Sequence, residues 1–123
     1  MGNAIEIHDG DFYLRIYLDK IEELPASNFR RVMRLLQKHP EALAQAGDFL
    51  RERVAICKAG LDGTRREYDA GWREVNPRSR STVALKILAE NKRLSQNLQQ
   101  AKNRYATFNR LLQIYENQGG NHA

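Results

Sequence analysis

The sequence predicts a mainly helical α+β fold: a long antiparallel, coiled-coil-like helical hairpin with a short third helix and a small N-terminal β-hairpin packed at its base. Three observations predict it. Residues 4–18 alternate apolar and polar side chains, two later runs carry apolar residues at heptad spacing, and a short break at 76–79 separates those runs. Period-two alternation indicates strands, and spacing by three and four indicates paired helices. With 123 residues, we expect a single domain over 1–123.

Residues 4–18 read as a β-hairpin. Asp9-Gly10 lies between the two alternating runs. This dipeptide is a strong signal for a two-residue type I′ turn, which needs positive φ at both central positions. With these two residues as the turn, Ile7 pairs with Phe12.

The two faces of this hairpin differ in character. One face is aliphatic and must be covered by helices, because an isolated two-stranded ribbon is marginal in water. Its members are Ile5, Ile7, Phe12, Leu14 and Ile16. The other face carries Tyr13, Arg15 and Tyr17 beside Glu6. That face is a candidate partner surface, and the alternative is an ordinary solvated face.

A short helix is expected over 27–39, with Ser27 as its N-cap. An apolar stripe at helical spacing marks its buried side. The stripe consists of Phe29, Val32, Met33 and Leu36. Arg30, Arg31 and Arg34 lie elsewhere on this helix, with no acid among them. Such a basic helix either meets phosphate or an acidic groove, or is simply a solvated surface helix.

Two helical arms are expected over 41–75 and 80–117, followed by a tail over 118–123. The second arm has a heptad seam, which is typical of coiled-coil packing. Its members are Ala84, Ile87, Asn91, Leu94, Leu98, Ala101, Tyr105, Phe108, Leu112 and Tyr115. The first arm has the same spacing in Leu43, Gly47, Leu50, Val54, Cys57, Leu61, Thr64, Tyr68, Gly71 and Val75. Its glycines at 60 and 63 leave two alternatives, a continuous helix or a break near 60–63.

The two seams also predict a register. Facing residues of an antiparallel pair have positions that add to a constant, and a turn at 76–79 fixes that constant. The facing pairs that it predicts are Gly47–Phe108, Thr64–Asn91 and Gly71–Ala84. The two polar seam residues would then satisfy each other and help to fix the register.

No motif for catalysis, cofactor binding or metal binding is present in the sequence. Residues 60–64 lack the spacing and the lysine of a nucleotide-binding loop. His8, His39 and His122 have no ligand spacing, and the single cysteine, Cys57, reads as a core residue. We therefore expect a protein that is not an enzyme and that holds no cofactor or metal.

The sequence also suggests where the protein acts. It lacks an apolar run of about 18 residues, so no membrane span is expected. Its first eight residues lack the basic and apolar segments of a secretory signal. A single cysteine suits a reducing compartment. We expect a cytoplasmic protein.

The charge is distributed unevenly along the chain. Residues 1–24 carry two basic and six acidic side chains, whereas residues 77–123 carry eight basic and two acidic ones, within an overall net charge of +5. A basic end points toward an acidic partner surface on protein or nucleic acid, and the alternative is a solvated helix surface.

The predicted turn gathers Trp72, Arg73, Arg78 and Arg80. Guanidinium groups bind phosphates and carboxylates, and an indole ring offers a stacking plane, so these residues form a candidate contact site. The alternative for Trp72 is packing on the flank of the seam, near Val83 or Leu88.

Three functions from different classes follow. The first is a protein-interaction module that docks on, and inhibits or modulates, a larger protein assembly, with assemblies that process nucleic acid among the candidates. The second is direct, sequence-nonspecific nucleic-acid binding through the basic turn and the short basic helix. The third is structural self-assembly into a homo-oligomer. The sequence does not name the partner.

Overall fold

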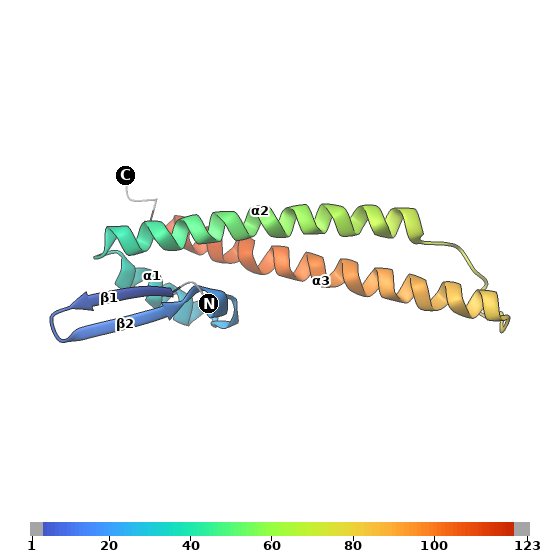
Figure 1. The fold of residues 1–123 in the computed structure, drawn as a ribbon, viewed down its shortest axis with the longest axis horizontal. Helices are drawn as coiled ribbons and strands as arrows, with labels where there is room; N and C mark the ends of the chain where they lie inside the picture. Colours follow the sequence, from blue (N-terminus) through green and yellow to red (C-terminus); the bar gives the residue numbers. More distant parts are fainter. Residues whose placement is uncertain (1–3, 120–123) are drawn as a thin grey trace. The chain divides into compact units, whose positions relative to one another are not determined.

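The computed structural model describes residues 4–119 and contains two strands and a set of helices in this part of the chain (Figure 1). Their order is β1 (Ala4–Asp9), β2 (Phe12–Tyr17), the 3-10 helix η1 (Leu18–Glu23), α1 (Ala26–Leu36), α2 (Pro40–Gly71) and α3 (Thr82–Gly119). The predicted fold class is confirmed: a mainly helical chain with an N-terminal antiparallel β-hairpin and two long packed helices. Residues 120–123 of the predicted tail, with His122, lie outside the described residues.

The chain divides into two compact units. Unit 1 comprises residues 1–55 and 107–123, and unit 2 comprises residues 56–106. Each long helix therefore contributes one part to unit 1 and one part to unit 2. Unit 1 also contains the β-hairpin, η1 and α1.

The β-hairpin turns one residue later than predicted. Asp9 pairs with Phe12 and Ile7 pairs with Leu14, so the turn residues are Gly10 and Asp11. Gly10 has φ of 61°, and no other described residue has positive φ. Positive φ at the first central position alone is the requirement of a type II′ turn, whereas type I′ needs it at both. The partner of each β1 residue shifts by two positions, so each residue stays on its predicted face. The aliphatic face is not covered over its whole length, because Phe12 beside the turn is 45% exposed.

Unit 1 contains a dense core built from all of its elements. The strands and η1 bury aliphatic side chains, α1 buries one stripe, and the adjoining parts of α2 and α3 complete the core. The buried residues are Ile5, Ile7, Ile16, Leu18, Ile21, Phe29, Met33, Leu36, Ala46, Phe49, Leu50, Phe108, Leu111 and Ile114. Burial of these side chains is the main stabilising contribution to unit 1.

Polar contacts connect the same elements at the rim of this core. Arg53 of α2 forms an ion pair with Asp19 of η1, with 3.6 Å between the charged atoms. The amide Nε2 of Gln37 donates to the carbonyl oxygen of Gln118 at 3.0 Å, linking the segment after α1 to α3. Both contacts are exposed, so they contribute little compared with the core.

The boundaries of α1 differ slightly from the predicted 27–39. The helix begins at Ala26, its N-cap is Pro25 without a side-chain hydrogen bond, and it ends at Leu36. Ser27 therefore lies in the first turn and is not the cap. The predicted stripe is confirmed at Phe29, Met33 and Leu36, which are fully buried, while Val32 is half-buried.

α2 is continuous from Pro40 to Gly71, so the break near 60–63 does not occur. The helix ends four residues before the predicted boundary at Val75. Residues 72–81, called the connection from here on, are not helical, and α3 begins at Thr82. The link between the long helices is thus longer than the predicted break at 76–79.

The register of α2 and α3 differs from the predicted one in both units. In unit 1, a Cβ added at Gly47 would overlap the ring of Tyr115 rather than meet Phe108. In unit 2, a Cβ added at Gly71 would lie 2.9 Å from Cδ1 of Leu94 rather than near Ala84. Both observed partners belong to the predicted seam but lie seven or more residues further along it. Both contacts therefore involve predicted seam residues, but in another pairing, and Val75 of the predicted seam lies outside α2.

The predicted Thr64–Asn91 pair is also wrong. The Thr64 hydroxyl donates to the carbonyl oxygen of Gly60 in its own helix at 2.8 Å. Asn91 bonds to the backbone of Arg73 instead. Serine and threonine often bond back to a carbonyl four residues earlier in a helix, which removes the need for a partner across the seam.

Candidate partner-binding surface in unit 2

The end of α2 presents an aromatic pair. The amide of Trp72 donates to the Tyr68 carbonyl at 2.9 Å, which closes the last helical turn. The indole ring stacks on the Tyr68 ring, with 5.2 Å between centroids and 25° between planes. Trp72 is still 43% exposed. Of the two neighbours suggested for Trp72, Leu88 lines the same groove as the indole ring. The other, Val83, is 69% exposed.

Asn91 fixes the start of the connection. The Arg73 amide donates to Oδ1 of Asn91 at 3.1 Å, and Nδ2 of Asn91 donates to the Arg73 carbonyl at 2.7 Å. These two bonds reproduce the pattern by which one strand pairs with the next. Asn91 is 5% exposed, so its amide would be costly without these partners. One buried side chain of α3 therefore holds the backbone of the connection at Arg73.

Local hydrogen bonds of side chains and backbone order the end of the connection. Oδ1 of Asn76 accepts from the Arg78 amide at 3.0 Å, and the Asn76 carbonyl accepts from the Ser79 amide at 3.0 Å. Ser81 caps α3, because its hydroxyl accepts from the Ala84 amide at 3.1 Å. Arg78 lies within this ordered turn and is exposed.

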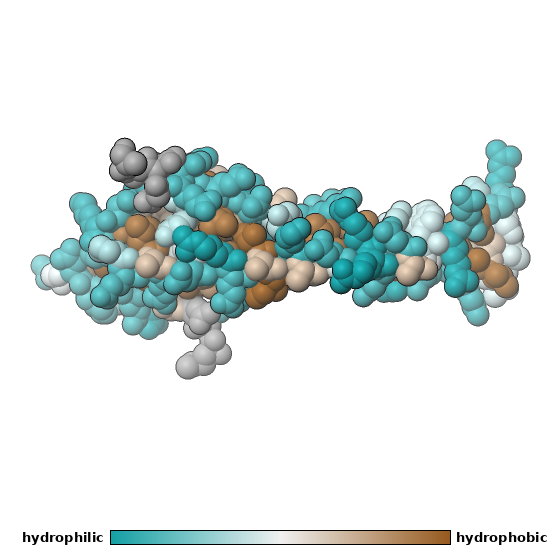
Figure 2. All heavy atoms as spheres, turned by 90° about the horizontal axis from the view of Figure 1, so that it is seen from above, coloured by the Kyte–Doolittle hydropathy of each residue, from teal (hydrophilic) through white to brown (hydrophobic). Residues whose placement is uncertain are grey.

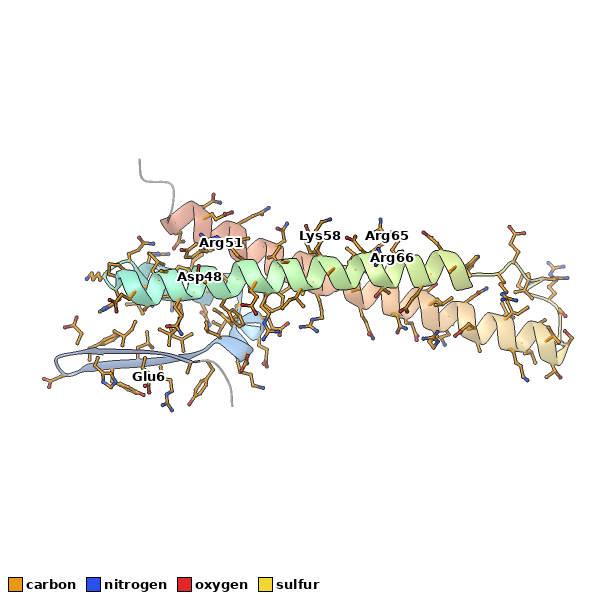
Figure 3. The ribbon with its side chains drawn as sticks, turned by 45° about the horizontal axis from the view of Figure 1, so that its top comes forward. Glu6, Asp48, Arg51, Lys58, Arg65 and Arg66 are labelled. Atoms are coloured by element: carbon orange, nitrogen blue, oxygen red, sulfur yellow. The ribbon has the colours of Figure 1, made fainter. Side chains whose placement is uncertain are left out.

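Unit 2 carries all of the excess positive charge. It contains eleven basic and five acidic residues, a net charge of +6, whereas unit 1 contains nine and ten. Among the described residues of unit 2, ion pairs join Lys58 to Asp62 at 4.0 Å and Arg93 to Glu90. Arg93 lowers the pKa of Glu90 through its hydrogen bond. Figure 3 shows Lys58 and Arg65 on the same side of α2.

Unit 2 also exposes large apolar side chains. Leu85, near the start of α3, is 47% exposed. Val83 and Trp72 are exposed to the fractions given above. Figure 2 shows hydrophobic (brown) side chains among hydrophilic ones at the end of the view that holds the connection and the start of α3. Large apolar side chains interleaved with cations are the composition of a docking surface.

The other predicted surface, the outer face of the β-hairpin, is a closed polar network. Glu6 accepts from the Tyr13 hydroxyl at 2.8 Å and from Nε of Arg15 at 2.9 Å. A guanidinium nitrogen of Arg15 also donates to the Tyr17 hydroxyl at 3.3 Å. The bonds from Tyr13 and Arg15 lower the pKa of Glu6, and the bond to Glu6 raises the pKa of Tyr13. The predicted residues here are brought together, but their polar atoms already have partners.

The α1 arginines lie in unit 1, apart from the set in unit 2. Arg30, Arg31 and Arg34 are all exposed, on the sides of α1 away from its buried stripe. Among the described residues, none of them forms an ion pair. The predicted site residues thus fall into three sets. The set around the connection places an exposed indole ring beside cations that form no ion pair among the described residues, and α1 exposes one large apolar side chain, Leu35 at 45%, beside its arginines.

Comparisons with known proteins give no further guide. No family model matches the chain, and neither a curated protein nor a solved structure matches it.

The described residues contain neither a metal-binding group of side chains nor a helix suited to crossing a membrane. No group of three or more histidine, cysteine, aspartate or glutamate side chains there is arranged to hold a metal ion. Over the same residues, no helix has the length and apolar character that crossing a bilayer requires.

The partner of Asn91 and the exposure of Val83 and Leu85 were not predicted from the sequence. Asn91 was identified as a polar seam residue, but its partner was misassigned because a helical first arm was expected to reach residue 75. Val83 and Leu85 fall off the heptad seam, and apolar residues off the seam at a helix start were the available signal. Such residues lack a partner in their own hairpin, so a partner surface is a reasonable expectation for them.

Proposed function

We propose that this chain is a cytoplasmic, non-enzymatic binding protein whose unit 2 docks on an acidic protein surface of a larger assembly and thereby inhibits or modulates it. One observation carries the proposal. Unit 2 exposes Trp72, Val83 and Leu85 among arginines that form no ion pair within the described residues. Tryptophan and arginine dominate the energetics of protein interfaces, because both bury large surfaces and form directional contacts.

A protein partner is favoured over nucleic acid by the aliphatic part of this surface. Val83 and Leu85 offer nothing to a phosphate backbone, whereas a protein partner buries them. Five acidic side chains also interrupt the basic residues of unit 2. Such interruption weakens a continuous phosphate-binding track but provides complementary pairs for a protein of mixed charge.

Direct nucleic-acid binding is the second candidate, because of the Trp72–Tyr68 stack. An exposed indole beside arginines is the arrangement on which unpaired bases stack in single-stranded nucleic-acid-binding proteins. The two candidates differ in their salt dependence, since phosphate contacts release counterions and weaken steeply as salt rises.

The test compares two triple variants with equal loss of charge. One replaces Arg73, Arg78 and Arg80 with glutamine, and the other replaces the three α1 arginines with glutamine. Capture of binding partners from a native lysate, with and without nuclease, should fall for the first variant and stay unchanged for the second. Circular dichroism should show unchanged helicity for both, because all six side chains are exposed. Equal capture by wild type and the first variant would overturn the proposal.

A further inference from the structure

The connection and α3 line an open groove of about 490 Å³ in unit 2. Its walls are mostly apolar: Trp72, Val75 and Pro77 come from the connection, and Leu88 comes from α3. Ser95 lines it further along α3. The volume falls within the range of about 300–1,000 Å³ that is usual for ligand pockets.

The groove is built into the fold. Asn91 contributes to its lining and holds the Arg73 backbone through the two hydrogen bonds described above. The Trp72 ring is held by its stack on Tyr68. The first residues of the connection are therefore fixed from two sides, and little ordering is needed when a ligand binds.

The charge around the groove selects an acidic ligand. Arg73 and Lys92 line it, and neither forms an ion pair among the described residues, while Glu74 is the acid in the lining. The unit as a whole carries a net charge of +6. A ligand with carboxylates at its ends and an apolar centre would match both the walls and the rim.

We propose that this groove binds an acidic peptide segment of a protein partner, with one large apolar side chain of that segment inserted between Trp72 and Leu88. The carboxylates on either side of the inserted side chain pair with Arg73 and Lys92. This inference rests on the proposed function and specifies the part of the partner that unit 2 recognises.

The probe is a short fluorescein-labelled peptide of aspartates and glutamates with one central phenylalanine. We expect binding that weakens when phenylalanine becomes serine and when the carboxylates become amides, because each change removes one of the two matched features. Both controls must lose at least about tenfold in affinity, which corresponds to roughly 1.4 kcal/mol. Binding that survives the serine replacement would overturn insertion of an apolar side chain.

Two adjacent tryptophan variants locate the site. Ser95 and Gln96 are both exposed residues of α3, but Ser95 lines the groove and Gln96 is absent from its lining. Ser95→Trp should fill the groove and weaken peptide binding at least about tenfold. Gln96→Trp should leave affinity within about twofold, with unchanged circular dichroism for both variants. Equal affinity in the two variants would overturn the groove as the binding site.

A labelled single-stranded oligothymidylate, tested in parallel, separates the peptide from nucleic acid. We expect it to bind more weakly than the peptide and to be insensitive to Ser95→Trp. Tighter binding than the peptide, lost in Ser95→Trp, would overturn the peptide as the ligand.

The triple variant of the connection arginines distinguishes this inference from the proposed function. If that variant loses partner capture and Ser95→Trp does not, unit 2 docks on its partner and the groove is not the docking site. If neither variant loses capture, the proposed function itself fails.

Discussion

Unit 1 and unit 2 are built on the same two long helices, yet their interiors differ greatly. The eight largest fully buried side chains of the described residues all belong to unit 1. In unit 2 the buried residues are Cys57, Ala84, Leu94 and Asn91, one of them polar. The reason is geometric: unit 1 has a β-hairpin and α1 to complete its core, whereas the described part of unit 2 has only a helix pair and the connection.

The net positive charge is larger in the unit that has fewer buried side chains. Unit 1 has a net charge of −1, and unit 2 has a net charge of +6. A unit with few buried side chains and much unpaired charge contributes less to the free energy of folding and leaves more of its surface for partners. The larger core thus belongs to unit 1, and the surface that we propose for recognition belongs to unit 2.

The largest expected effect is a core truncation in unit 1. Phe29→Ala should lower the free energy of unfolding by about 3–5 kcal/mol, because Phe29 is fully buried and its loss leaves a cavity. Tyr105→Ala, at a half-buried position of unit 2, should cost about 1 kcal/mol. Urea unfolding followed by circular dichroism measures both. Similar costs would mean that unit 2 contains a core as dense as that of unit 1.

A methyl group added where the helices approach closely should have the next largest effect. Gly47→Ala places a Cβ against the Tyr115 ring, so the ring must move, at a cost of about 1–3 kcal/mol. The matched control is Gly60→Ala, which has nothing within 4 Å and should stabilise α2 by up to about 1 kcal/mol.

The same pair of residues tests the register. Combining Gly47→Ala with Tyr115→Ser should recover part of that cost, since the ring no longer occupies the space. If Phe108→Ser recovered it instead, the pairing expected from the sequence would be correct.

A smaller effect is expected at the side chain that holds the connection. Asn91→Ala removes both bonds to the Arg73 backbone and should cost about 1 kcal/mol, because water can partly replace them at the exposed Arg73. Amide hydrogen exchange gives a local readout: protection of the Arg73 amide should be lost while amides of the unit 1 core keep theirs. Unchanged protection at Arg73 would show that another group holds the connection.

The smallest effect concerns the exposed network on the β-hairpin. The bonds from Tyr13 and Arg15 lower the pKa of Glu6 from its ordinary value of 4.5. Because the folded hairpin favours the ionised carboxylate, this contribution to stability is fully present at pH values above 4.5. It is lost as the pH falls through the lowered pKa of Glu6. NMR titration should place the Glu6 inflection higher in Tyr13→Phe than in wild type. Tyr17→Phe, which removes no bond to Glu6, should leave it in place.

Local features of the fold were predictable from the sequence. Alternation in residues 4–18 identified both faces of the hairpin, and a one-residue error in the turn changed the pairing by two positions without changing the faces. Phe29, Met33 and Leu36 were assigned to the core from helical spacing alone. These predictions succeed because they depend on periods of two and 3.6 residues, which the backbone geometry imposes locally.

The candidate site was predicted only in part. Trp72, Arg73, Arg78 and Arg80 were identified by their types, but the groove beside them was not, because it forms where a non-helical segment follows Gly71. The outer face of the hairpin was also identified, and only its hydrogen bonds to Glu6 reveal that its polar groups are already engaged.

The sequence by itself indicated many of the seam residues and two long helices that pair antiparallel. Only the tertiary structure decided which seam residues meet. A pattern that repeats every seven residues matches itself again after a shift of seven, so Gly47 fits Phe108 and Tyr115 equally well by periodicity. The choice depends on where α2 ends and how much chain the connection uses. In unit 2, Asn91 bonds to the backbone of Arg73 in the connection, and Thr64 bonds within its own helix.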